Sequence, residues 1–308
     1  MDKVKIGNKQ IYQVLDFSND EDNIDIINNI EHLSISGVQE KLSVVINKGR
    51  LVIADRDTQS THILKTIPSV RTLRYREYIP ANENLTMDIA KQVYKIKTAD
   101  NAIVFFKNSE MAYLTKRFDI DANGNKIMQE DFSSLMQINN PSHNSKYYGS
   151  YEDIALLISK YTKATKIELG KFFKLVLFNY LFGNGDAHLK NFSLQITPNL
   201  DYVLTPAYDL MNTSLHINDS DFALSDGLSR GLIRSEIYTN TSHPCIEDFI
   251  EFGKIIGLLD IQINSLIKPF IQKQDKVYDL CNNSYFDNRL KRMYIRSYEE
   301  RFSRLIRK

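Results

Sequence analysis

The first part of the chain carries short apolar runs with the alternation and β-branching of strands. We predict strands at 41–46, 51–53, 62–66, 103–106 and 112–118. The segment 47–50 (NKGR) predicts a turn between the first two of them. Apolar residues recur on one helical face between 80 and 93, so a helix is expected there. A polar turn cluster at 119–126 then ends the strand-rich region.

Beyond that cluster the apolar residues follow the period of helices. The predicted helices are 129–136, 151–161, 168–182, 246–259, 261–281 and 286–305. Short strands are expected at 192–196 and 202–204, and the polar segment 215–240 is expected to be mostly loop. The pattern therefore predicts an α+β fold with two domains, a strand-rich N-terminal lobe (1–118) and a helical C-terminal lobe (119–308). A cleft between two such lobes is a common place for a ligand.

Composition narrows the class of protein. The chain has 308 residues, of which 43% are hydrophobic and 25% are charged, which argues against general disorder. A net charge of +1 gives no overall attraction to nucleic acid or anionic lipid. The most apolar run, 172–182, contains Lys174 and Asn179 and is too short to span a bilayer. The start of the chain lacks the apolar core of a signal peptide, and two cysteines are too few for a disulfide framework. We expect a cytoplasmic protein without membrane contact.

The segment NGDAHLKN at 184–191 carries the clearest chemical signal. An Asp followed five residues later by an Asn occurs at phosphoryl-transfer sites, where the Asp accepts the proton of the attacking hydroxyl and the Asn binds Mg²⁺. Asp186 and Asn191 have this spacing, and Asp209 follows the next predicted hairpin. Mg²⁺ prefers oxygen ligands, which Asn191 and Asp209 supply. The alternative is a polar turn in which Asp186 caps a helix and Asn191 bonds to the backbone.

Two further features suit a nucleotide. The segment HLSISGVQEK at 32–41 has small residues whose N–H groups can approach phosphate, although it lacks the Walker A pattern and could be a hairpin turn. Lys65 lies inside an apolar predicted strand, where a lysine is costly unless it is paired or faces a cleft. Glu83 on the next helix is a candidate partner. The alternatives are an edge-strand lysine that reaches solvent and a solvated Glu in a first helical turn.

In this order, SISGVQEKLS, STHILKT, YLTKRFD, QEDF, NGDAHLKN and PAYDLMNT resemble the motifs of the HipA-type toxin kinases. The resemblance runs from about residue 33 to residue 212. It implies a bilobed protein-kinase-like fold with the ATP cleft between the lobes, and ATP and Mg²⁺ as cofactors. It also implies phosphorylation of Ser or Thr in a protein substrate, with an aminoacyl-tRNA synthetase as the expected target.

The resemblance also assigns roles to residues. Asp186 would be the catalytic base, Asn191 and Asp209 the Mg²⁺ ligands, and Lys65 would hold the ATP phosphates. The implied phosphate loop consists of Ser36, Gly37, Val38, Gln39, Glu40 and Lys41. The backbone of Lys116, Arg117 and Phe118 would meet adenine. Further residues implied at the nucleotide are His188, Leu189, Lys190 and Tyr208.

Only residues 1–31 precede the phosphate loop, where long members of the family carry an additional subdomain. This resembles the short HipT kinases of three-gene HipBST systems, in which that subdomain is a separate small antitoxin. A helix-turn-helix DNA-binding antitoxin is the second implied partner, so that DNA is contacted only indirectly. Ser34-Ile35-Ser36 reproduces an autophosphorylation motif of those kinases, which makes Ser34 and Ser36 regulatory candidates.

Two other interpretations remain open. Small-molecule kinases of the aminoglycoside phosphotransferase type carry a motif close to 184–191, with His where this chain has Asn184. A catalytically dead nucleotide-binding module is the other interpretation. The presence of Lys65, Asp186, Asn191 and Asp209 disfavours it, because such modules usually lose one of these residues.

Overall fold

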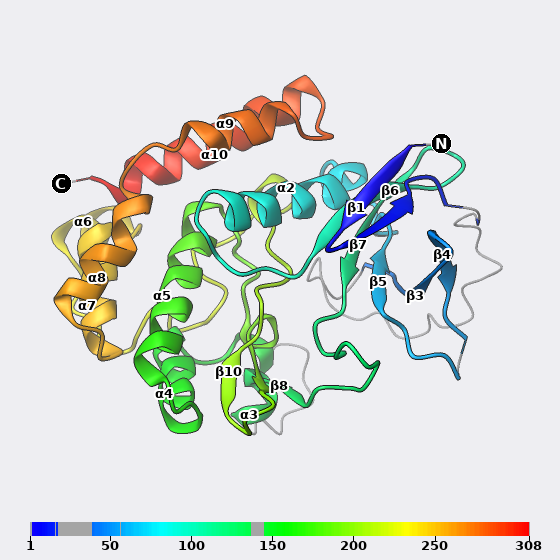
Figure 1. The fold of residues 1–308 in the computed structure, drawn as a ribbon. Helices are drawn as coiled ribbons and strands as arrows, with labels where there is room; N and C mark the ends of the chain where they lie inside the picture. Colours follow the sequence, from blue (N-terminus) through cyan, green and yellow to red (C-terminus); the bar gives the residue numbers. More distant parts are fainter. Residues whose placement is uncertain (1, 16, 18–38, 56, 137–144, 308) are drawn as a thin grey trace.

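The computed structural model describes residues 2–15, 17, 39–55, 57–136 and 145–307. Ser34, Ser36, Gly37 and Val38 lie outside the described residues. These residues belong to the predicted autophosphorylation motif and to the first half of the predicted phosphate loop. Among the described residues, most strands lie in the N-terminal part and most helices lie in the C-terminal part (Figure 1). The predicted α+β fold class is confirmed.

A five-stranded antiparallel sheet forms the centre of the N-terminal part. Its strand order is β4-β3-β5-β7-β6. The strands are β3 (Lys41–Asn47), β4 (Arg50–Ile53), β5 (His62–Lys65), β6 (Asn101–Phe105) and β7 (Met111–Lys116). The turn between β3 and β4 places Lys48 and Gly49 at φ 47° and 78°, the left-handed conformation that a tight hairpin requires. All five strands lie within two residues of the predicted positions.

A second hairpin, β1 (Lys3–Ile6) and β2 (Lys9–Tyr12), packs on this sheet and was not predicted. Each strand is only four residues long and is rich in lysine, so the alternation was too short to detect. Ile6 and Ile11 are nevertheless fully buried, in a cluster with Leu64 of β5 and Val104 of β6. This small cluster is separate from the main core of the molecule.

Helix α2 (Ile79–Gln92) joins the two parts (Figure 1). It follows the short 3-10 helix η2 (Arg76–Tyr78), and its early Pro80 is tolerated because the first-turn N–H groups have no partner inside the helix. The helix contacts β6 and β7 on one side and α9 on the other. Its apolar residues, including Leu85 and Ile89, belong to the main core together with the C-terminal helices.

The C-terminal part is built around α5 (Thr165–Leu181), which contacts α4, α8 and α10. The other helices are α4 (Tyr151–Tyr161), α6 (Glu236–Thr241), α7 (Ile246–Ile255), α8 (Asp260–Ile267), α9 (Asp275–Asn282) and α10 (Asn288–Leu305). Ser150 and Asp153 form a capping box at the start of α4. Among the described residues, no helix is long and apolar enough to cross a membrane.

Two predicted helices are wrong in part. Residues 129–136 begin as strand β8 (Gln129–Asp131), which pairs with β9 (Ser193–Ile196), and only α3 (Phe132–Leu135) is helical. Strand β10 (Tyr202–Leu204) completes this three-stranded sheet. The single helix predicted at 261–281 is divided into α8, the 3-10 helix η6 (Lys268–Phe270) and α9. Pro269 lies at the division and lacks the N–H group that a continuous helix needs.

The end of one further predicted helix differs in the structure, for a local reason. The helix predicted at 246–259 ends at Ile255, and Gly257 at φ 83° turns the chain toward α8. The segment 215–240 is mostly irregular as predicted, and α6 begins only at its end. Cys245 and Cys281 are buried free thiols, as expected for small apolar residues.

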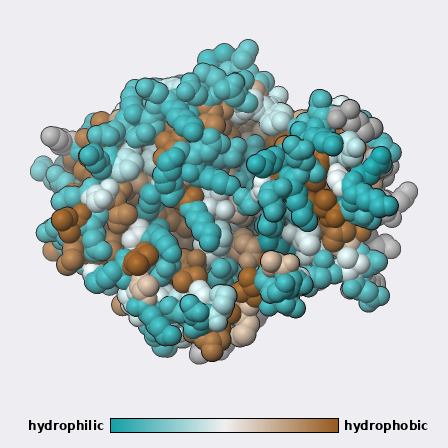
Figure 2. All heavy atoms as spheres, viewed as in Figure 1, coloured by the Kyte–Doolittle hydropathy of each residue, from teal (hydrophilic) through white to brown (hydrophobic). Residues whose placement is uncertain are grey.

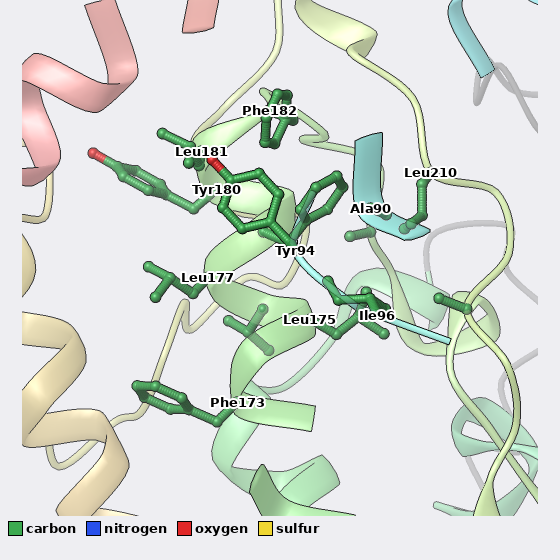
Figure 3. Close-up of a cluster of buried hydrophobic side chains, with 14 of the residues drawn as sticks. Ala90, Tyr94, Ile96, Phe173, Leu175, Leu177, Tyr180, Leu181, Phe182 and Leu210 are labelled. Atoms are coloured by element: carbon green, nitrogen blue, oxygen red, sulfur yellow. The ribbon is translucent and has the colours of Figure 1, made fainter. Parts of the chain in front are cut away.

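Aromatic side chains fill the main core where α5 ends (Figure 3). Phe182 is fully buried, with its ring stacked on Tyr298 of α10 at 5.2 Å and on Phe178 at 4.5 Å. Tyr94, which follows α2, meets Phe182 edge-on at 5.5 Å. The end of α2, the end of α5 and the middle of α10 are therefore held together by one group of rings.

We expect Phe182→Ala to lower the free energy of unfolding by about 3–5 kcal/mol, because it leaves a cavity among these rings. Urea denaturation monitored by circular dichroism measures the loss. Ile233 is 81% exposed, and Ile233→Ala is the control, with an expected change below about 0.5 kcal/mol. Equal losses in the two variants would contradict the central place of Phe182 in the core.

Candidate active site

A buried lysine connects the two parts of the molecule. The Lys65 ammonium, at the end of β5, donates to Glu83 Oε1 of α2 at 2.6 Å and to the carboxylate of Asp209. Lys65 is 5% exposed and Glu83 1%. The predicted pair of Lys65 and Glu83 is thus confirmed. The alternative of an edge-strand lysine is wrong, since β5 has neighbours on both sides.

Burial and the neighbouring charges have opposite effects on the pKa values of the groups in this cluster. Burial alone would lower the pKa of Lys65, but Asp209 and Glu83 outweigh it and raise that pKa above its usual value. Burial raises the pKa of Glu83 to about 7 against the opposing effect of Lys65. For Asp209, Lys65 and Lys41 overcome the effect of burial and hold the carboxyl pKa well below its usual value. The charged pair is therefore Lys65 and Asp209, with Glu83 as the more easily protonated partner.

The segment 184–191 forms a tight loop after α5, ending in the 3-10 helix η4 (Leu189–Asn191). The Gly185 N–H donates to Thr213 Oγ1 at 2.9 Å, and the His188 N–H donates to Asn191 Oδ1 at 3.0 Å. A side chain at Gly185 would collide with the carboxyl group of Asp219 and the carbonyl of Ser220. The loop therefore needs glycine immediately before Asp186.

Asp186 lies in this loop and is hydrogen-bonded to a tyrosine. The Tyr147 hydroxyl, from the 3-10 helix η3 (Ser145–Tyr147), donates to Asp186 Oδ1 at 2.7 Å. Burial raises the pKa of Asp186 to about 6, and the bond from Tyr147 and the charge of Lys146 oppose that rise. At pH 7 the carboxylate is mostly ionised and can accept a proton.

Asn191 and Asp209 are in direct contact, with Asn191 Nδ2 donating to Asp209 Oδ2 at 3.3 Å. Their oxygens are of the type that Mg²⁺ prefers, and Mg²⁺ usually takes only one or two carboxylates from a protein. The donor set therefore fits this ion. Asn191 Oδ1 also accepts the His188 N–H at 3.0 Å, and an amide oxygen has a second lone pair.

His188 in this loop has a buried imidazole ring. Its two ring nitrogens are buried and have no hydrogen-bond partner in the described part of the chain. Burial lowers the pKa of this imidazole to about 3, so the ring is neutral. Buried polar atoms are rarely left unpaired, and an unpaired imidazole in this loop is consistent with contact to a nucleotide.

The described part of the predicted phosphate loop lies beside Lys65. Gln39 Nε2 donates to the Thr66 carbonyl at 2.7 Å, and the Thr66 N–H donates to the Glu40 carbonyl at 3.2 Å. Lys41 is the register partner of Lys65 across β3 and β5. These contacts fix the end of the loop next to the buried lysine.

The predicted hinge is partly occupied by internal contacts. The Lys116 N–H bonds to Asp100 and the Arg117 N–H to Thr61, so neither group is available to adenine in this arrangement. Phe118 meets the ring of Tyr208 at 5.4 Å. The Tyr208 hydroxyl in turn bonds to the Lys190 carbonyl at 2.8 Å, while Leu189 is fully buried and Lys190 is exposed.

Three further residues lie at this site: Tyr147, Asp219, and Thr213, which ends the motif PAYDLMNT. Tyr147 belongs to no motif, and its contact with Asp186 spans 39 positions. Thr213 and Asp219 are bonded to each other beside the Asp186 loop. The requirement for glycine at position 185 was the one local signal that a neighbour packs closely there.

The family model "HipA-like C-terminal domain" matches residues 33–299. A Haemophilus influenzae protein named "Putative kinase" is 28% identical over 288 residues, which are 89% of this chain and 82% of that protein. The serine/threonine-protein kinase toxin HipA of Shewanella oneidensis is 29% identical over 200 residues, 60% of this chain but only 44% of that protein.

Two solved structures share the fold. The Shewanella oneidensis HipA chain, from a complex with HipB and operator DNA, has a TM-score of 0.66 and 21% identity, covering 92% of this chain and 67% of that one. The Helicobacter pylori proinflammatory kinase CtkA has a TM-score of 0.54 and 14% identity, covering 85% of this chain and 93% of that one. The fold is thus that of two kinases. The matching family model identifies the family, and this chain belongs to the HipA-like kinases. Membership of this kinase family implies ATP as the cofactor.

We expect Lys65→Met to lower the free energy of unfolding at pH 7 by about 3–5 kcal/mol, because it leaves the buried Glu83 and the partly buried Asp209 without the ammonium that bridges them. In the variant, the pKa values of these carboxyls are raised above the unfolded values. Protonation therefore restores stability as the pH falls, and the loss measured by urea denaturation should be smaller at pH 5.

The control is Lys91→Met, which removes an exposed pair with Asp100 and should cost less than about 1 kcal/mol. A loss at Lys65 that is equally small, or that does not change with pH, would contradict a buried ionic cluster.

We expect the acidic limb of kcat/KM to lie near the pKa of about 6 for Asp186. The Tyr147 hydroxyl stabilises the ionised carboxylate, so Tyr147→Phe should raise that pKa and move the limb to higher pH. The measurement is the pH profile of ATP-dependent phosphorylation. Tyr148, which is 55% exposed, provides the control Tyr148→Phe. A profile that shifts to lower pH in Tyr147→Phe would show that the bond does not act in this way.

Proposed function

We propose that this chain is an ATP- and Mg²⁺-dependent serine/threonine protein kinase. The observation that carries the proposal is the buried Lys65, which joins Glu83 of α2 to Asp209 beside the Asp186–Asn191 loop. A strand lysine paired with a helix glutamate, near a metal-binding Asp and a catalytic Asp, is the arrangement of protein kinases. Family membership supports the same conclusion.

Different residues would bind the phosphates and the metal ion. Lys65 and the loop from Ser36 to Lys41 would contact the phosphates, and Asp209 and Asn191 would hold Mg²⁺, which neutralises charge on the phosphates when bound. In the structure, the Lys65 ammonium donates to the carboxylate of Asp209. Nucleotide binding would therefore exchange part of this ion pair for contacts to phosphate and metal. His188, with two unpaired nitrogens, would contact the nucleotide in the same loop.

Asp186 would act as the base. It would orient the hydroxyl of the acceptor and take its proton while the oxygen attacks the γ-phosphorus and the bond to ADP breaks. Its raised pKa of about 6 leaves it ionised at neutral pH yet makes it a better proton acceptor than an exposed aspartate. Tyr147 bonds to the same carboxylate, and the acceptor hydroxyl would replace this bond or share it.

A large cavity beside this loop suits a protein acceptor. It has a volume of about 830 Å³ and is lined by the segment 214–243 and by α10. Asp219 lines it and also contacts the loop at Gly185, which links the cavity to the neighbourhood of Asp186. Polar side chains such as Ser225, Arg234 and Tyr238 offer hydrogen bonds to an extended peptide.

The finer biological role is part of the proposal. Similarity to a protein named as a toxin kinase supports a toxin that phosphorylates a translation component, for which an aminoacyl-tRNA synthetase is our candidate. The motif Ser34-Ile35-Ser36 supports a HipT-like enzyme regulated by autophosphorylation at Ser34 or Ser36. The solved relative was crystallised with HipB and operator DNA, and we propose a DNA-binding antitoxin and a small second antitoxin as partners here.

Asp186→Asn and Asp209→Asn should each reduce transfer of labelled phosphate from ATP by at least about 100-fold, because the first removes the base and the second a metal ligand. Both variants should remain folded by circular dichroism. The control is Asp57→Asn, at an exposed position far from the loop in sequence, which should retain activity.

The same variants identify the target. Phosphoproteomes of cells that express the chain or its Asp186→Asn form should differ at Ser or Thr of a translation protein, and growth arrest should follow the active form only. Full phosphotransfer by Asp186→Asn would overturn the kinase assignment. Label on a sugar rather than on a protein would overturn the protein substrate.

A further inference from the structure

A second depression, which we name the lysine-rimmed groove, lies away from the polar cavity. Its volume is about 620 Å³, and it is bordered by α5, α8, β10 and the segment 95–97. Its walls are apolar and include Ile96, Leu175, Val203, Leu204 and Leu266. In the view of Figure 2, which faces α5 and β10 as in Figure 1, teal side chains surround brown ones over the middle of the molecule.

The groove is strongly basic, in contrast to the chain as a whole. Its lining contains five lysines and, among the described residues, no aspartate or glutamate: Lys95, Lys97, Lys166, Lys171 and Lys174. The whole chain has 39 basic and 38 acidic side chains, so this excess is a property of one face. Such a local field attracts an anionic partner even though the net charge of the protein is only +1.

The internal contacts of these lysines leave most of the charge uncompensated. Only Lys171 has an ion-pair partner among the described residues, the buried Glu168 at 2.7 Å. Lys95 reaches the Gln92 carbonyl at 2.8 Å, and Lys166 reaches the Gly257 carbonyl. Partial burial lowers the pKa of Lys174, so a carboxylate placed beside it would favour its charged form.

The apolar part of the groove continues onto its rim. Ile167 of α5 is 63% exposed and Ile261 of α8 is 77% exposed, and both line the groove. Exposed aliphatic side chains at the edge of an apolar depression mark an interaction site more often than isolated ones do. A ligand that matches this surface needs apolar side chains toward the floor and carboxylates toward the rim.

We propose that the lysine-rimmed groove binds an acidic amphipathic segment of a partner protein. Leu, Ile or Phe side chains of the segment would enter the groove, and Asp or Glu side chains would pair with the lysines. A nucleic acid is disfavoured as the occupant because the floor is aliphatic and its phosphates would leave that surface unfilled. The binding itself does not depend on kinase activity.

The groove lies directly behind the candidate active site. Asn191 and Ala207 line it, and Ala207 precedes Tyr208 and Asp209. The Ala207 N–H bonds to the Lys97 carbonyl at 2.8 Å, and the Ala99 N–H bonds to the Ala207 carbonyl at 2.9 Å. A docked segment would therefore contact the stretch after β10 that carries the candidate metal ligand Asp209, which places its protein close to the site.

The test measures peptide binding to the full chain without ATP, so that it can fail independently of the proposed function. The probe is a fluorescent synthetic peptide with Leu and Glu at helical spacing, and a peptide with Lys in place of Glu is the reference. Fluorescence anisotropy should show binding of the acidic peptide only, and the binding should weaken as salt is added.

Lys97→Glu and Ile167→Asp should each weaken binding by about tenfold or more. Lys126→Glu and Ile233→Asp place the same changes at exposed positions outside the groove and should have no effect. Circular dichroism confirms that all four variants are folded. Binding of both peptides, or equal affinity in all variants, would overturn the proposal. So would a single-stranded oligonucleotide that binds the groove and is weakened by Lys97→Glu but not by Ile167→Asp, because the occupant would then be nucleic acid.

Discussion

A single buried ammonium holds the candidate active site together. Lys65 is far from solvent, and burying an unpaired charge is so costly that the fold must supply anions to it. Glu83 and Asp209 do so from two different elements, the helix that follows β5 and the segment that follows β10. The relative position of the sheet, α2 and the catalytic loop is therefore constrained by one electrostatic requirement.

The same requirement explains why the pKa values of the two carboxyl groups shift in opposite directions. At Asp209, Lys65 and Lys41 outweigh burial and keep the carboxylate ionised, whereas burial and the charge of Asp209 raise the pKa of Glu83 and make it easier to protonate. Asp209 also adopts a positive φ of 55°, a conformation that aspartate tolerates better than most residues. Backbone strain of this kind is concentrated at functional sites, and the surrounding contacts of Tyr208 and Asn191 hold it in place.

The sequence was most informative where chemistry and local pattern coincide. Alternation predicted all five strands of the main sheet, and a lysine inside such a strand predicted a charged partner that the structure confirms. It was least informative where tertiary contacts override the local pattern. Residues 129–131 follow a helical period but form a strand because β9 offers them an edge. The break at Pro269 could have been predicted, since proline ends a helix for a local reason.

The sequence by itself determined the class of fold and the loop from Asp186 to Asn191, because period and short spacing are local properties of the chain. It also placed the chain within a kinase family through motifs that keep their order. Only the tertiary structure decided that Lys65 meets Asp209, 144 positions away, and that Tyr147 donates to Asp186. It alone gathered five lysines around an apolar groove, because which faces meet depends on packing between elements distant in sequence.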